Sequence, residues 1–190
     1  MSKWLPGDLL LFSALHPGWS ARSIMRGQQR GYAEEDARWH HAAVYLGDGI
    51  SICEATARGV RDTSIYGYLG GYLLRVRRGI NLTSDQQWLI AMQSLTRLGS
   101  PYGFRSILSL AWQSWQGYWQ PGNRLPLLGA RAVICSQLFS DSYSMVTGRL
   151  LVQGPSGTVT PAALSFTSQL ADVPTTWLQI SEKEVGGTPA

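Results

Sequence analysis

The sequence predicts a domain of the α+β class, with strands mainly in its first half and helices mainly in its second. Hydrophobic residues make up 44% of the 190 positions and charged residues 15%, as in folded rather than disordered chains. Two apolar runs flank Asp48-Gly49, a dipeptide that favours a two-residue hairpin turn. Capping residues and apolar stripes further along indicate helices. We therefore expect one domain over residues 1–181 and a polar, glycine-rich, disordered tail over residues 182–190.

Strands are expected where short apolar runs lie between turn residues. They are Asp8–Ser13, His41–Gly47, Ile50–Thr56 and Tyr72–Arg77, with Thr176–Ile180 as a candidate last strand. After the first strand, Ser20–Arg26 has the pattern of a short helix with Ser20 as its N-cap. The polar segment Gly31–Arg38 is expected to form a loop.

Helices are expected in the second half of the chain. Ser84 begins one, with Gln87 completing a capping box and Gly99 at its far end. The others are predicted over Phe104–Trp115, over Ser136–Met145 and from Thr160-Pro161 onward, where threonine is the cap and proline the first helical residue.

The hairpin places two groups with catalytic chemistry on one face of the sheet. A two-residue turn pairs Tyr45 with Ile52 and Ala43 with Glu54, so His41 and Glu54 become diagonal neighbours. A carboxylate beside an imidazole fixes its tautomer and stabilises the imidazolium. A three-residue turn would change this pairing, and a surface carboxylate on a half-exposed strand is an equally simple interpretation of Glu54.

The neighbouring residues have simpler explanations. Cys53 and His40 point to the face opposite Glu54, so we expect Cys53 to pack in the core and His40 to face solvent or pack. His16 lies in a loop before Pro17, and no role is assigned to it.

Cys135 follows the apolar run Ala132–Ile134 and precedes a predicted helix. At a helix N-terminus, unpaired N–H groups and the helix dipole stabilise a thiolate and can hold an oxyanion. One cysteine and one histidine do not make a site, however, because chain distance says nothing about distance in space. From these residues alone, an inert buried cysteine is the simpler explanation.

Composition limits the cofactors and partners. Two cysteines cannot form a disulfide framework; one bridge between Cys53 and Cys135 stays open, but a reduced compartment is the simpler assumption. The chain's histidines, His16, His40 and His41, give no metal-binding spacing with them, so neither metal nor cofactor is expected. The net charge of +4 is a weak steering term without a nucleic-acid motif, so no nucleic acid is expected.

No segment has the length and flanks of a signal peptide or of a transmembrane helix. The sequence therefore leaves a cytoplasmic location or delivery by a non-classical or virus-borne route open. One aromatic cluster is a candidate membrane contact, although a core or lid position explains it better: Trp112, Trp115, Tyr118 and Trp119.

The order of these motifs resembles the permuted branch of the NlpC/P60 papain-like superfamily, in particular its bacterial YiiX-like members. In that branch the histidine strand precedes the cysteine helix. The matching motifs are Gly7-Asp8, His41-Ala42-Ala43-Val44-Tyr45-Leu46-Gly47, Cys53-Glu54-Ala55, Gly59-Val60, Gly99-Ser100-Pro101-Tyr102, Ile134-Cys135-Ser136-Gln137-Leu138 and Thr160-Pro161. No single motif is specific, but the ordered set covers roughly residues 5–180.

The resemblance implies a permuted papain-like fold, in which a small antiparallel sheet or barrel packs against helices. It also implies that Cys135 is the nucleophile, His41 the base and Glu54 the third polar residue. Tyr102 becomes a candidate substrate-binding residue, or equally a packing aromatic. Two positions depart from the family pattern without removing a catalytic group: Gln137 stands where Glu is usual, and His40 stands where Ser is common.

Three functions are compatible with these residues. The first is a cysteine hydrolase that cleaves an amide bond through a thioester, with a peptide or cell-wall amide as substrate. The second is a lipid or acyl-group hydrolase or acyltransferase of the same fold. The third is a non-catalytic structural or binding module, for instance in a virus-borne assembly, although such a module has no evident need for Cys135, His41 and Glu54 together.

Overall fold

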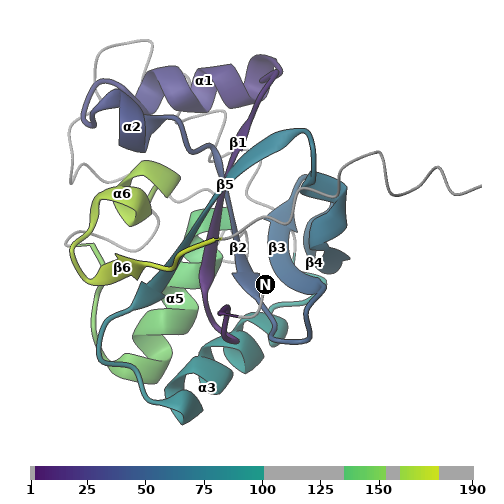
Figure 1. Ribbon diagram of the computed structural model, residues 1–190, viewed down its shortest axis with the longest axis vertical. Coiled ribbons are helices and arrows are strands. Elements are labelled where there is room, and N and C mark those ends of the chain that lie inside the picture. Colours follow the sequence, from purple (N-terminus) through teal and green to yellow (C-terminus); the bar gives the residue numbers. More distant parts are fainter. Residues whose placement is uncertain (1–2, 101–134, 153–158, 176–190) are drawn as a thin grey trace, which may run out of the picture.

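The computed structural model of the chain describes residues 3–100, 135–152 and 159–175, and its strands form one antiparallel six-stranded sheet in the order β4-β3-β2-β1-β5-β6 (Figure 1). The strands are β1 (Leu9–Ala14), β2 (His41–Tyr45), β3 (Ser51–Thr56), β4 (Gly59–Ser64), β5 (Tyr72–Gly79) and β6 (Leu170–Asp172). The α-helices are α1 (Trp19–Gln28), α2 (Glu34–Ala37), α3 (Ser84–Leu95), α5 (Cys135–Thr147) and α6 (Pro161–Phe166). A short 3-10 helix, η1 (Ile65–Tyr68), links β4 to β5.

The central strand β1 contributes to a hydrophobic cluster on each face of the sheet. Leu9 and Leu11 belong to the cluster that includes Leu138 and Phe139 of α5, on the face where α3 and α5 pack (Figure 1). Leu10 and Phe12, which point the other way, belong to a second cluster with Tyr45, Ile52 and Ile65. Because residues 9–12 are all fully buried, this strand appears in the sequence as a continuous apolar run and not as an alternating one.

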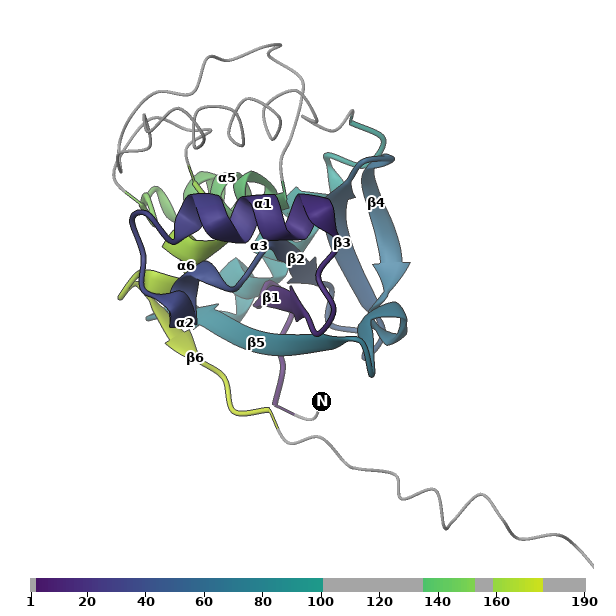
Figure 2. The same cartoon turned by 90° about the horizontal axis from the view of Figure 1, so that it is seen from above.

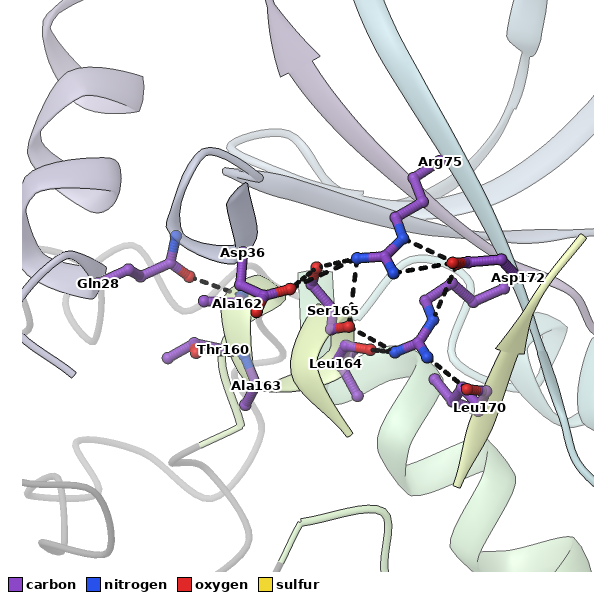
Figure 3. Close-up of polar contacts among 11 residues, drawn as sticks. Gln28, Asp36, Arg75, Thr160, Ala162, Ala163, Leu164, Ser165, Leu170 and Asp172 are labelled. Carbon is purple, nitrogen blue, oxygen red and sulfur yellow. Dashed lines mark hydrogen bonds and ion pairs between the residues drawn. The ribbon is translucent and has the colours of Figure 1, made fainter. Parts of the chain in front are cut away.

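Helix α1 lies across the end of the sheet at which β1 ends and β2 begins (Figure 2). Its buried Gln28 side chain donates to the carbonyl oxygens of Ala37 at 2.9 Å and Trp39 at 2.7 Å. The same side chain accepts a hydrogen bond from the Ala162 N–H at 2.9 Å (Figure 3). One buried amide therefore ties α1 to the segment that leads into β2 and to the first turn of α6.

A network of charged side chains holds α6 against β5 and β6 (Figure 3). Arg75 donates to both oxygens of Asp172, at 2.8 and 2.9 Å, and to the Ser165 hydroxyl at 2.6 Å. Ser165 in turn donates to Asp36 of α2 at 2.5 Å. Buried Arg77 donates to the carbonyl oxygens of Ser165 and of two further residues, Leu164 and Leu170.

The same region supports the first turn of α5. The Ser136 hydroxyl donates to the carbonyl oxygen of Val159 at 2.7 Å, two residues before α6 begins at Pro161. Thr160 caps α6 by accepting the Ala163 N–H at 3.1 Å, as predicted. The start of α5 is thus joined to a helix that the charged network fixes to the sheet.

The predicted register of the hairpin is confirmed, with Tyr45 opposite Ile52 and Ala43 opposite Glu54. The strands are shorter than predicted, because β2 ends at Tyr45 and β3 begins at Ser51, so residues 46–50 connect them in place of a two-residue turn. Asp48 stabilises the turn because its Oδ1 accepts from the Ile50 and Ser51 N–H groups at 2.9 and 2.6 Å. The strand predicted over Tyr72–Arg77 is also confirmed, although β5 extends to Gly79.

Two helix starts differ from the prediction by one residue. Helix α1 begins at Trp19 after Gly18, with no side-chain cap, so the prediction of Ser20 as N-cap is wrong. The capping box of α3 is formed by Thr83 and Gln86, not by Ser84 and Gln87, because the backbone is still extended at Thr83.

Four elements are absent from the sequence prediction. Residues 34–37 of the predicted loop form α2, whose first turn is acidic and therefore complements the helix dipole. Strand β4 also went unpredicted because it is mostly polar, and η1 and β6 went unpredicted because they span only four and three residues.

Several predictions lie outside the described residues and stay predictions: the helix over 104–115, Tyr102, the aromatic cluster at 112–119, the run at 132–134, the strand at 176–180 and the tail at 182–190. The single-domain boundary at residue 181 is likewise untested. Within the three described ranges, no helix has both the length and the apolar character that crossing a bilayer requires.

Candidate active site

Cys135, His41 and Glu54 form a chain of hydrogen bonds at the end of the sheet beneath α1. His41 is the first residue of β2 and Cys135 the first of α5, while Glu54 lies in the middle of β3. The Nε2 atom of His41 lies 2.7 Å from Oε2 of Glu54, and the Cys135 thiol is hydrogen-bonded to the His41 ring. Because Nε2 is engaged by Glu54, Nδ1 is the ring nitrogen left for the thiol.

The antiparallel register produces this arrangement. Glu54 lies opposite Ala43, so His41 is its diagonal neighbour on the same face of the sheet. The covered face holds Ala42 and the first turn of α5, which brings Cys135 to the start of β2. His41, at the start of β2, and Cys135, at the start of α5, therefore lie together where the helix packs on the sheet.

Glu54 is fully buried and both of its oxygens are bonded. Thr63 and Arg61 of β4 donate to Oε1 at 2.9 and 3.2 Å, and the Tyr68 hydroxyl joins His41 in donating to Oε2. Burial alone would raise the pKa of Glu54, but its hydrogen bond and charge attraction to His41, with the other donors, lower the pKa to about 2. The interpretation of Glu54 as a surface carboxylate is therefore wrong: it is a buried anion.

The thiol and the imidazole stabilise each other in their charged forms. Burial lowers the pKa of His41, but hydrogen bonds and charge attraction to Cys135 and Glu54 outweigh burial and raise the pKa to about 9. Burial raises the pKa of Cys135, whereas His41 and backbone hydrogen bonds from Ala42 and Ser136 bring it below its usual value. Cys135 is 5% exposed and the His41 side chain 14%, so the pair is largely shielded from water. This arrangement favours a thiolate–imidazolium pair.

Cys53 behaves as the sequence predicts, packing in the core with no exposed surface. Its sulfur lies 3.5 Å from the Ser94 carbonyl oxygen, and burial raises its pKa to about 11. Cys53 and Cys135 are both free, so the bridge between them that the sequence left open does not form.

His40 packs beside the site without joining it. Its Nε2 accepts the Ala14 N–H at 2.9 Å, and burial together with the neighbouring His41 lowers its pKa to about 4. The neutral ring is therefore the form that supports the end of β1.

Gln137, one residue beyond Ser136, hydrogen-bonds the Asp141 carboxylate one turn further along α5.

A pocket of about 360 Å³, here called the active-site cleft, opens onto His41. Ala21 and Ile24 of α1 line one side, and Ala14 and Ala55 come from the strand ends. His16, which received no role from the sequence, also lines the cleft.

A second pocket of about 460 Å³ lies next to the cleft and shares Tyr68 and Tyr72 with it. We call it the apolar pocket, because its remaining lining is Phe12, Trp39, Ile65, Leu69, Gly70, Leu73 and Leu74.

Sequence reasoning missed the residues that surround Glu54: Arg61, Thr63 and Tyr68. Arg61 and Thr63 alternate along β4 behind a two-residue connection from Thr56 to Gly59, where Gly59 has a φ of +100°. That glycine and the period-2 spacing were available signals for a second hairpin. Nothing local marks Tyr68, whose position depends on how η1 folds back over the sheet.

Metal ligands were not predicted, and within residues 3–100, 135–152 and 159–175 no group of three or more His, Cys, Asp or Glu side chains could hold an ion. The described residues instead bring together a thiol, an imidazole and a buried carboxylate.

No protein-family model matches this chain, and no curated protein sequence matches it. A crystal structure of the metalloprotein YiiX from Escherichia coli O157:H7 has a similar fold, with a TM-score of 0.62 and 16% sequence identity. The aligned region covers 93% of this chain and 99% of that chain. At this identity the likeness establishes a YiiX-like α+β fold.

Proposed function

We propose that this protein is a cysteine hydrolase of the permuted papain-like (NlpC/P60) type, which cleaves an amide bond through a thioester on Cys135. The observation that carries the proposal is the buried hydrogen-bonded chain from Cys135 through His41 to Glu54. The YiiX-like fold supports it, because the sequence resemblance points to the same group.

In the proposed reaction, the Cys135 thiolate attacks the carbonyl carbon and forms a C–S bond, and the carbonyl oxygen becomes an oxyanion. Cys135 is the first residue of α5, so unpaired backbone N–H groups in the first turn of that helix are available to stabilise the charge. The His41 imidazolium then gives its proton to the amide nitrogen, the C–N bond breaks and the amine leaves.

Hydrolysis of the thioester reverses these roles. Neutral His41 takes a proton from a water molecule, whose oxygen attacks the thioester carbon, and the C–S bond breaks to release the acid. Glu54 stays ionised throughout, because its pKa is about 2, and it stabilises each imidazolium state of His41.

The substrate class proposed first is an amide within a peptide, such as a cell-wall stem peptide. The active-site cleft beside His41 supplies the space for such a chain. YiiX is described as a metalloprotein. In the described part of this chain no group of three or more His, Cys, Asp or Glu side chains could hold an ion, so no step is derived through a metal.

Trapping the acyl-enzyme tests this proposal. The folded protein is mixed with a panel of peptide amides and activated esters, quenched in acid and digested, and the Cys135 and Cys53 peptides are weighed by mass spectrometry. We expect a substrate-derived mass on the Cys135 peptide in the native protein and in Cys53→Ala, and none in His41→Ala. Amide cleavage without any adduct at Cys135, and unimpaired in Cys135→Ala, would exclude this mechanism.

The apolar pocket favours acyl-group chemistry as a second candidate function. An alkyl chain that enters the cleft could continue past Tyr68 and Tyr72 into a lining of leucine, isoleucine and phenylalanine. Nitrophenyl esters of increasing acyl length separate the two candidates. A value of kcat/KM that rises with chain length, and falls in Leu74→Asp, supports acyl substrates; independence of chain length supports peptide amides.

A further inference from the structure

Tyr68 contacts two members of the candidate site at once. It is the last residue of η1, and its hydroxyl donates to Oε2 of Glu54, the oxygen that His41 also binds. The other donors to Glu54, Thr63 and Arg61, bind Oε1 instead. Tyr68 therefore shares with His41 the oxygen on which the geometry of the His41–Glu54 hydrogen bond depends.

The ring of Tyr68 packs against two neighbouring rings, those of Phe12 and His41. It stacks on Phe12 with the ring centroids 4.1 Å apart and the planes at 28°. It also lies nearly parallel to the His41 ring, with centroids 5.9 Å apart and planes at 15°. Phe12 lies directly opposite His41 on β1, so the three rings form one packed group over the sheet.

The phenol remains a donor whenever Glu54 is ionised. Burial and the Glu54 charge both raise the pKa of Tyr68 above its usual value of 10. At neutral pH the hydroxyl therefore keeps its proton, and the bond to Glu54 persists while His41 gains and loses a proton.

We propose that Tyr68 is a positioning residue for this site, because its hydroxyl fixes the Glu54 carboxylate while its ring fixes the plane of His41. The inference rests on the proposed function and extends it, since Tyr68 also lines the active-site cleft and thereby forms the wall next to the base. Tyr68 itself takes no part in bond making or breaking.

The test compares Tyr68→Phe, which keeps the ring and removes only the hydroxyl, with Tyr66→Phe. Tyr66 belongs to the same 3-10 helix and is 53% exposed, away from Glu54, so it is a matched control. Two readouts are used, and neither needs a substrate. One is the second-order rate constant for alkylation of Cys135 at neutral pH, and the other is the carboxyl ¹³C titration of Glu54.

We expect Tyr68→Phe to slow Cys135 alkylation about tenfold and to raise the titration midpoint of Glu54 by about one pH unit, because a lost donor destabilises the carboxylate. Tyr66→Phe should stay within about twofold of the native rate. Should Tyr68→Phe melt before it can be assayed, Thr63→Val provides the test on its own. Thr63 donates to Oε1 and not to the oxygen that His41 binds, so Thr63→Val should raise the Glu54 titration midpoint but leave Cys135 alkylation within about twofold of the native rate. A slowing of about tenfold in Thr63→Val, the size expected for Tyr68→Phe, would overturn the inference, because loss of any Glu54 donor would then have the same effect.

Native alkylation rates in Tyr68→Phe would overturn the inference, whether or not the Glu54 titration moves. A thioester on Cys135 in that same variant would show that the proposed function survives. Conversely, a slowed Tyr68→Phe together with no acyl-enzyme from any substrate supports the role of Tyr68 and counts against the proposed hydrolase.

Discussion

Replacing Glu54 by glutamine removes a buried negative charge while keeping the shape of the side chain. The pKa of Glu54 is about 2, against a usual value of 4.5. At about 1.36 kcal/mol per pH unit, this difference corresponds to about 3 kcal/mol of folding free energy. Because the folded-state pKa is depressed, that contribution is complete above pH 4.5 and is lost as the pH falls toward 2.

Urea unfolding at a series of pH values measures this contribution. We expect the native protein to be more stable than Glu54→Gln at pH 7, and the gap to narrow by about 2 kcal/mol between pH 5 and pH 3. Other carboxylates titrate in both proteins, so they cancel in the difference. Glu34→Gln is the control, since Glu34 is exposed at the start of α2 and should follow the native curve within about 0.5 kcal/mol. Parallel curves for the native protein and Glu54→Gln from pH 7 to pH 3 would refute the description of Glu54 as a buried ion.

Three further variants test the supporting structure. Gly7→Ala should lower the free energy of unfolding in urea by about 2 kcal/mol or more, because Gly7 has a φ of +78° and a Cβ there would lie 2.4 Å from the Gln87 carbonyl oxygen. An unchanged unfolding midpoint would contradict the backbone conformation described at Gly7. Arg77→Met should lower the free energy of unfolding by about 3 kcal/mol, because three carbonyl oxygens lose the guanidinium donor and Asp172 keeps only Arg75 as its partner. Cys135 alkylation should stay at the native rate, and loss of that reactivity would mean that the network shapes the site directly. Cys53→Ala should leave Cys135 alkylation unchanged, since the Cys53 thiol is buried in the core with a pKa of about 11; a slower Cys135 would argue that Cys53 supports the site.

The part of the site that lies on one hairpin was accessible from the sequence. Asp48-Gly49 fixed the register, and the period of the strand then placed His41 and Glu54 on one face. The same counting put Cys53 on the opposite face, where the structure has it in the core. Local chemistry sufficed because every step spans only a few residues.

The contact with Cys135 could not be obtained that way. It joins residues 41 and 135, and it depends on α5 packing over β2, which no local pattern encodes. The resemblance of the motif order to a known family predicted that Cys135 pairs with His41. The structure gives the physical cause, which is the packing of α5 on β2. The burial of Glu54 was missed for a related reason. It depends on β4, which is mostly polar, and on η1, which spans only four residues, and both gave weak signals in the sequence.

Helix ends show the limits of capping rules. Thr83 and Ser84 are both good N-caps, and Gln86 and Gln87 are both good partners, so the sequence allows two registers for the box. The structure selects the earlier one, in which Thr83 is extended and Gln86 Oε1 accepts its N–H at 3.1 Å. At Trp19 the helix starts without any side-chain cap, so no local rule identifies it.

The reactivity of the two cysteines across pH tests the central claim most directly. The folded protein is alkylated between pH 5 and pH 9, and each cysteine is quantified by peptide mass, with His41→Ala in parallel. The thiolate–imidazolium pair predicts rapid labelling of Cys135 well below the ordinary thiol pKa of about 8.5, protection of Cys53 until unfolding, and a shift of the Cys135 profile to higher pH in His41→Ala. A Cys135 that is as unreactive as Cys53 until the protein unfolds would contradict the account.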